Sequence, residues 1–225
     1  MLSAYVFDLD GTLVDTAPDL LAVINIVMAR EGRRAIATDE IRRLVGRGVK
    51  VLIEKAFKET GIPVDPARLD GLFDDYLGLY AARVAEESRP YPGVVETLTR
   101  LKAAGSPLAV LTNKPHALAE KLLSALGMRS LFGAVFGAGK MPYLKPDARL
   151  FADVRRELSW NGPAVMVGDS ITDVQTARNA KVPVVLVSYG YTPEPAANLG
   201  ADAVVDDFRA VPAAAAKLPG VAGGA

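Results

Sequence analysis

The sequence contains no cysteine among its 225 residues. This absence excludes a disulfide framework, a thiolate metal site and a cysteine nucleophile. The chain also has no net charge, because the charges of its 26 basic and 26 acidic residues cancel at neutral pH. No global field therefore draws the protein to nucleic acid or to an anionic membrane, and local groups must bind any anionic ligand.

Long apolar runs are missing as well. No stretch approaches the ~20 residues of a membrane span. The first seven residues lead into an acidic cluster, without the basic region and the small-residue cleavage site of a signal peptide. Half of the residues are hydrophobic and 23% are charged, an ordinary globular composition. We therefore expect a cytoplasmic protein, monomeric or homodimeric, with neither a nucleic-acid nor a membrane partner.

Short apolar runs alternate with longer helical patterns through most of the chain. Runs this short and continuous fit strands that are buried on both faces of a parallel sheet. The alternation predicts an α/β fold, a doubly wound, Rossmann-like parallel sheet with right-handed crossovers. The strand candidates are residues 4–9, 107–111, 134–136, 164–167 and 182–187, and the helix candidates are 93–104, 115–126, 147–158 and 172–180.

Residues 16–89 break this alternation, since they contain no convincing strand. Apolar residues recur there at helical spacing, and the last stripe includes Tyr76 and Tyr80, which we interpret as core of a helical bundle. We expect an all-helical cap over residues 16–89, inserted after the first strand of a core that comprises residues 1–15 and 90–225. The Ala/Gly-rich tail from Ala213 is expected to fray.

The first strand candidate ends in two carboxylates, Asp8 and Asp10, followed by Gly11. In open parallel sheets, ligands bind beyond the carboxyl ends of the strands. Strand alternation places Asp8 and Asp10 on the same side of the chain, and Gly11 allows the backbone to turn close to a ligand. Because two such close carboxylates do not titrate alike, a bound dication would decide which of them stays ionised.

Polar residues also follow three later strand candidates. Thr112 and Asn113 precede a helix start, which suits phosphate oxygens, although a simple helix N-cap has the same pattern. Lys145 could neutralise a phosphoryl group. Asp169 and Asp173 follow an apolar strand four residues apart, which is typical of a hard-cation site, since Mg²⁺ favours carboxylates, waters and substrate phosphate.

Taken together and in order, these four segments resemble the four motifs of the haloacid dehalogenase-like hydrolase superfamily over nearly the whole chain. The helical insert resembles the cap that lies between the first two motifs. Residues 44–52, around Gly46-Arg47-Gly48, resemble the cap of the phosphoglycolate phosphatase-like branch.

The resemblance implies a magnesium-dependent phosphatase that forms an aspartyl-phosphate. Asp8 would be the nucleophile, and Asp10 the acid for the leaving alcohol and then the base for water. By the same resemblance, Mg²⁺ would be bound by Asp8, the backbone carbonyl of Asp10 and Asp169, and Ser170 and Asp173 would support that metal site. The phosphate and the rest of the substrate would be bound by Gly11, Thr112, Asn113 and Lys145.

Within this superfamily, Asp10 favours an ester phosphatase or a phosphomutase. The dehalogenase and phosphonatase branches lack a carboxylate at this position, whereas the departing oxygen of a phosphate ester needs an acid. Arg47 could form a forked contact with a substrate carboxylate, or simply lie in an exposed turn. The first expected substrate is 2-phosphoglycolate or a similar small phosphorylated acid. A sugar-phosphate phosphatase, a pyrophosphatase, a β-phosphoglucomutase-like phosphotransferase and a non-catalytic phosphometabolite-binding regulator remain alternatives. The single histidine, His116, is expected at the surface.

Overall fold

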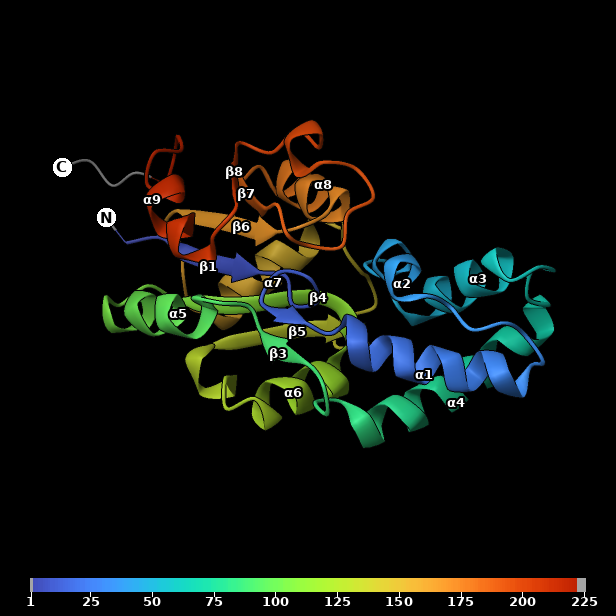
Figure 1. Ribbon diagram of the computed structural model, residues 1–225. Helices are drawn as coiled ribbons and strands as arrows, with labels where there is room; N and C mark the ends of the chain where they lie inside the picture. Colours follow the sequence, from blue (N-terminus) through green and yellow to red (C-terminus); the bar gives the residue numbers. More distant parts are fainter. Residues whose placement is uncertain (1, 222–225) are drawn as a thin grey trace.

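Six parallel strands form the centre of the protein in the computed structural model, which describes residues 2–221 (Figure 1). The strand order is β5-β4-β1-β6-β7-β8, so the first strand lies in the middle of the sheet. The bounds are β1 (Ala4–Phe7), β4 (Leu108–Pro115), β5 (Ala134–Ala138), β6 (Ala164–Gly168), β7 (Val184–Val187) and β8 (Ala203–Val205).

The side chains of β1 alternate between two hydrophobic layers, which explains why its sequence is apolar throughout. Tyr5 and Phe7 belong to the layer that includes residues of α5, α6 and α9, whereas Ala4 and Val6 pack in the layer with residues of α7 and α8. These helices are α5 (Val94–Ala103), α6 (His116–Ala125), α7 (Arg149–Glu157), α8 (Ile171–Ala180) and α9 (Val211–Ala215). The predicted doubly wound α/β fold is therefore confirmed.

Four helices lie beyond the carboxyl ends of β1 and β4 and form the helical insert (Figure 1). They are α1 (Ala17–Arg30), α2 (Thr38–Leu44), α3 (Val49–Glu59) and α4 (Pro66–Arg83). The chain leaves the sheet through β2 (Val14–Asp15) and returns through β3 (Arg89–Pro90), and these two short strands pair antiparallel. The insert is therefore connected to the core by two adjacent segments that contain β2 and β3.

Three details of the sequence-based prediction were wrong. The edge strand β8 has only three residues and was not anticipated. Two short strands, β2 and β3, flank the insert. The tail is packed as far as Val221: Val211, Ala215, Leu218 and Val221 are buried, and Oγ of Ser3 donates to the carbonyl of Val221 at 3.0 Å. Residues 222–225 lie outside the described residues.

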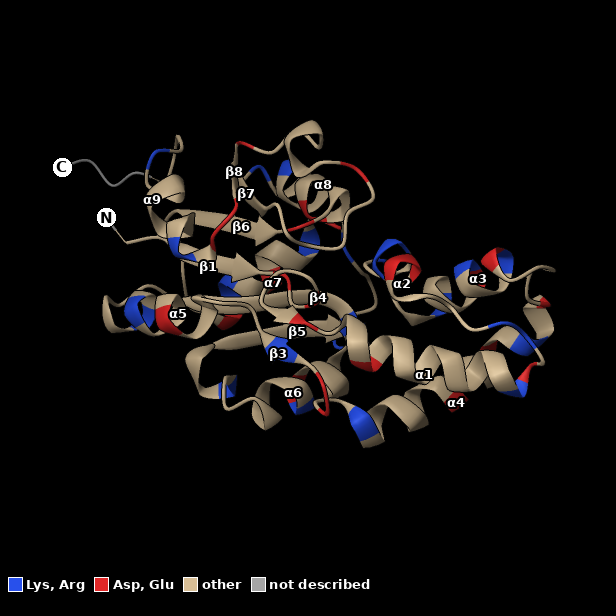
Figure 2. Ribbon diagram, in the orientation of Figure 1, with Lys and Arg blue, Asp and Glu red and all other residues tan. Residues whose placement is uncertain are grey.

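Three 3₁₀ turns complete the fold: η1 (Arg129–Leu131), η2 (Ala196–Asn198) and η3 (Phe208–Ala210). Basic and acidic residues are interspersed along the helices of the sheet and of the insert (Figure 2), as expected for a chain without net charge. Across residues 2–221, none of the helices is both long enough and apolar enough to cross a membrane.

Asp19 connects the two segments that link the helical insert to the core. Its buried carboxylate, in the first turn of α1, accepts hydrogen bonds from the amides of Glu87 and Ser88, each at 2.9 Å, and from Oγ of Ser88 at 2.6 Å. Asp19→Ala leaves these donors without a charged acceptor, so we expect the free energy of unfolding to fall by about 3 kcal/mol.

Urea unfolding followed by circular dichroism tests this expectation. Asp39→Ala is the matched control, because Asp39 is exposed in the first turn of α2. Equal unfolding midpoints for the two variants would contradict a structural role for Asp19.

Candidate active site

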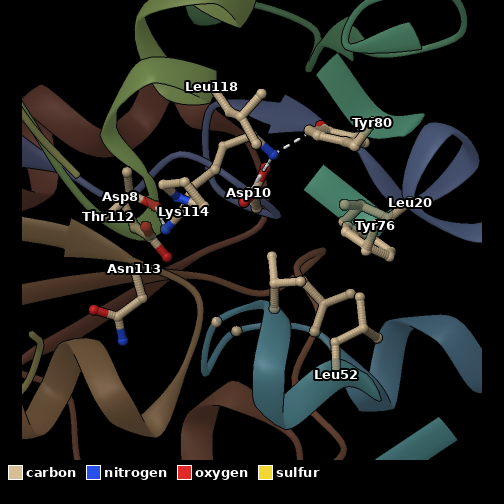
Figure 3. Close-up of a pocket in the computed structure, with 15 residues that line it drawn as sticks. Asp8, Asp10, Leu20, Leu52, Tyr76, Tyr80, Thr112, Asn113, Lys114 and Leu118 are labelled. Atoms are coloured by element: carbon tan, nitrogen blue, oxygen red, sulfur yellow. Dashed lines mark hydrogen bonds and ion pairs between the residues drawn. The ribbon is translucent and has the colours of Figure 1, made fainter. Parts of the chain in front are cut away.

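Two of the four polar segments, those that follow β1 and lie at the end of β4, meet at a cavity of about 40 Å³ between the sheet and the helical insert (Figure 3). Asp8, Asp10, Thr112, Asn113 and Lys114 contribute to its wall from the carboxyl ends of β1 and β4. The insert closes the other side with a mostly apolar wall that includes Leu20, Val45, Val49, Leu52, Tyr76 and Tyr80. The arrangement places the buried carboxylate of Asp8 and the partly buried carboxylate of Asp10 beside one small cavity.

A cluster of three buried carboxylates lies at the base of this site. One oxygen from each of Asp8, Asp169 and Asp173 lies within 4.8 Å of the others. Nζ of Lys145 lies 2.9 Å from Oδ1 of Asp8 and 2.7 Å from Oδ1 of Asp173. All four side chains are at least 92% shielded from solvent. Three carboxylates thus face one ammonium, which leaves two buried negative charges to be compensated.

The pKa values of the cluster reflect this uncompensated charge. Burial, which outweighs the ion pair with Lys145, raises the pKa of Asp8 to about 7. Burial and then the carboxylates of Asp173 and Asp8 raise the pKa of Asp169 well above its ordinary value. Burial pulls the pKa of Lys145 down, but Asp173 and Asp8 more than reverse this effect and hold the ammonium charged.

Asp169 is fixed by residues that the sequence analysis did not identify. Its Oδ1 accepts from Oγ1 of Thr12 at 3.0 Å, and its Oδ2 accepts from the amide of Tyr191 at 2.6 Å. The Tyr191 hydroxyl accepts from the amides of Thr16 and Ala17, at 2.7 and 2.9 Å, at the start of α1. Tyr191 therefore connects the carboxylate cluster with the point where the insert begins.

Asp173 is held in place by the start of its own helix. Its Oδ2 accepts from the amide and from Oγ of Ser170, at 3.0 and 2.7 Å, and from the amide of Asp169 at 3.2 Å. Its Oδ1 is left to face Lys145. The role of Ser170 and Asp173 in supporting a metal site stays a prediction.

Asn113 and Thr112 have structural partners of their own. The Asn113 side chain accepts from the amide of Lys145 at 2.9 Å and donates to the Lys145 carbonyl at 3.3 Å, so it positions the Lys145 backbone. Oγ1 of Thr112 accepts from the amide of Lys114 at 3.1 Å, which leaves its hydroxyl proton free to donate. Both residues line the cavity, where the predicted contacts with phosphate stay a prediction.

Lys114 is the main residue that the sequence analysis missed. Its ammonium is buried and lies 3.0 Å from Oδ1 and 3.3 Å from Oδ2 of Asp10, and it donates to the hydroxyl of Tyr80 at 2.7 Å (Figure 3). Tyr80 was interpreted as core of the insert, but it also reaches this site. The signal that could have identified Lys114 was its position, directly after Thr112 and Asn113 at the same strand end.

Two predicted site residues lie apart from the cavity wall. Gly46 and Gly48 line the cavity, but the Arg47 side chain between them is exposed and is not part of the lining. The amide of Gly11 donates to the carbonyl of Val14 at 2.9 Å, so in this conformation it is already satisfied. Gly11 has a φ of +85°, and an added Cβ would lie 2.6 Å from Oδ2 of Asp169, so the position needs glycine for space and conformation.

The donor set of the carboxylate cluster fits a hard divalent cation. Carboxylate and carbonyl oxygens are the ligands that Mg²⁺ prefers, and one dication would match the two uncompensated charges. Oδ1 of Asp8 is a buried oxygen for which the described residues offer no donor besides the Lys145 ammonium. His116, half-buried at the start of α6, is not part of the cluster.

Comparison with known proteins places this geometry in a family. The family model described as haloacid dehalogenase-like hydrolase matches residues 5–187. A phosphoglycolate phosphatase of Caulobacter vibrioides is 47% identical over 213 residues, which cover 94% of this chain and 90% of that protein.

Solved structures agree with this assignment. A structure titled as a predicted phosphoglycolate phosphatase from Haemophilus somnus superposes with a TM-score of 0.86 at 31% identity, covering 94% of this chain and 97% of that one. CbbY from Rhodobacter sphaeroides, solved in complex with phosphate, superposes with a TM-score of 0.77 at 27% identity and covers 93% of this chain and 96% of its own.

Proposed function

The chain belongs to the haloacid dehalogenase-like hydrolase family, and we propose that it is a Mg²⁺-dependent phosphatase that hydrolyses 2-phosphoglycolate or a similar small phosphorylated acid. The observation that carries this proposal is the placement of Asp8 and Asp10 together on the wall of one small cavity. Asp8 also belongs to the carboxylate cluster with Asp169 and Asp173, and it pairs with Lys145.

In the proposed mechanism, a carboxylate oxygen of Asp8 attacks phosphorus and the bond from phosphorus to the alcohol oxygen breaks. Asp10 gives a proton to the departing oxygen, so the alcohol leaves neutral and Asp8 carries the phosphoryl group as an acyl phosphate. Asp10 then takes a proton from water, which attacks phosphorus and releases inorganic phosphate and the Asp8 carboxylate. Lys145 offsets the negative charge that gathers on the phosphoryl oxygens.

Asp8, the backbone carbonyl of Asp10 and Asp169 would hold Mg²⁺, with Asp173 and Ser170 behind them. When bound, the ion supplies electrostatic stabilisation of the transferring phosphoryl group. The division into a core and a mobile helical cap over residues 16–89 is part of the same proposal, since a cap that opens would widen the access of substrate to the cavity between the two.

The size of the cavity supports a small substrate. The cavity volume of about 40 Å³ in this conformation is small, so a hexose phosphate would require a wider opening of the insert than 2-phosphoglycolate does. Curated relatives named phosphoglycolate phosphatase are 47% and 43% identical over more than nine-tenths of this chain, which favours the same substrate class.

Phosphate release from a panel of phosphomonoesters, with Mg²⁺ or with EDTA, tests this function. We expect Mg²⁺-dependent release that favours 2-phosphoglycolate over hexose phosphates, nucleotides and pyrophosphate by at least about tenfold in kcat/KM, and loss of that release in EDTA. A sugar-centred profile would keep the mechanism and replace the substrate. Absence of release from every ester would contradict the proposed function.

A further inference from the structure

We propose that Lys114 is the specificity-determining residue that binds the carboxylate of the substrate. This inference rests on the proposed function and adds a recognition site to it. Lys114 is the one cationic side chain among the described residues that line the cavity. A substrate with a second anionic group therefore meets a positive charge at this position.

The position of the Lys114 ammonium fits the geometry of a 2-phosphoglycolate-like acid. The ammonium lies 3.0 Å from Oδ1 of Asp10, the residue that gives a proton to the ester oxygen in the proposed reaction. In such an acid one methylene separates the ester oxygen from the carboxylate carbon. When Asp10 contacts the ester oxygen, the carboxylate consequently lies within reach of the neighbouring ammonium.

The hydrogen-bonding capacity of Lys114 also leaves room for a ligand. An ammonium has three N–H donors. The Tyr80 hydroxyl takes one of them, and the Asp10 carboxylate takes a second, which is shared between Oδ1 at 3.0 Å and Oδ2 at 3.3 Å. The third can bind a carboxylate oxygen, and burial makes such a charged contact stronger than it would be in water.

A second buried polar group points to a polar ligand in the same space. Tyr76 lines the cavity, is fully buried, and its hydroxyl has no hydrogen-bond partner within residues 2–221. A buried donor without a partner is costly, so a ligand oxygen would remove that cost. The remaining wall of the insert, including Leu52 and Val49, offers no competing polar group to an anion.

Paired substrates isolate the carboxylate. Ethyl phosphate differs from 2-phosphoglycolate only in having a methyl group where the carboxylate stands. We expect the wild-type enzyme to prefer 2-phosphoglycolate, and Lys114→Met to reduce that preference in kcat/KM by about 100-fold. Because both substrates share Asp10, any effect of Lys114 on the acid cancels in the ratio.

Lys121→Met is the matched control. Lys121 lies on α6, is exposed, and its ammonium donates to the carbonyl of Ala81 at 2.6 Å, so it also links the core to the insert but lies outside the cavity. This variant should keep the wild-type preference. An equal loss in both variants would assign the effect to closure of the insert and overturn the inference.

A binding measurement separates this inference from the proposed function. In an Asp8→Asn background, calorimetry should show that Lys114→Met weakens binding of 2-phosphoglycolate by about 100-fold and leaves binding of inorganic phosphate within about threefold. Equal weakening of both ligands would overturn the inference. If no ester is hydrolysed by the wild-type enzyme, the proposed function fails, and the binding measurement still decides the role of Lys114.

Discussion

Asp8→Asn should abolish phosphatase activity, with a loss in kcat on the order of 10⁴-fold or more. An amide cannot attack phosphorus as a carboxylate does, so no acyl phosphate can form. The fold should survive, because asparagine has nearly the same shape, and because burial raises the pKa of Asp8 to about 7, so that this carboxyl is only partly ionised near neutral pH. The measurement is the initial rate of phosphate release with saturating Mg²⁺.

Asp74→Asn provides the matched control for Asp8→Asn, since it makes the same chemical change at an exposed residue of α4. Acid-quenched reactions with ³²P-labelled substrate should show protein-bound label in the wild-type enzyme and none in Asp8→Asn. A variant that keeps its Mg²⁺-dependent rate would contradict the covalent mechanism.

Most of the fold could be predicted because the sheet is buried on both faces. Every residue of β1 and β6 is buried, and for this reason neither strand contains a charged side chain. An acidic residue follows each strand directly. The edge strand β8 lacks this signal, since Ala203 and Val204 are at least partly exposed. The tail after Ala213 was misjudged because a short Ala-rich segment has little periodicity, although Leu218 and Val221 pack on the core.

The candidate site was predictable where strand ends bring residues together, and less so where the insert or a distant loop contributes. Asp8 and Asp169 meet because they follow the neighbouring parallel strands β1 and β6, and Lys145 joins them through its ion pair with Asp8. The contact between Lys114 and Tyr80 joins β4 to α4, and no local pattern reveals a pairing across 34 residues. Arg47 carries the charge that an anion would need, but its side chain does not line the cavity, whereas its neighbours Gly46 and Gly48 do.

The loop after β7 shows how a residue without chemistry of its own can control the site. Gly190 precedes Tyr191, whose amide binds Oδ2 of Asp169. A Cβ at Gly190 would lie 2.1 Å from Cβ of Asp169, a separation that real Cβ atoms do not show. Glycine is therefore required here for space, and nothing in the local sequence indicates that a carboxylate 21 positions earlier packs against it.

Gly190→Ala should consequently displace Asp169 and weaken Mg²⁺ binding by about 10- to 100-fold, because outer contacts of this kind orient metal ligands. Activity at low Mg²⁺ should fall at least as far, and excess Mg²⁺ should restore part of it, which distinguishes a displaced ligand from an unfolded protein. Gly71→Ala is the control, since a Cβ there meets nothing within 4 Å and the residue is exposed on α4. If the Gly190→Ala enzyme keeps the wild-type Mg²⁺ dependence, Asp169 does not bind the ion. A carboxylate that is displaced by the added methyl group could not coordinate Mg²⁺ with unchanged geometry.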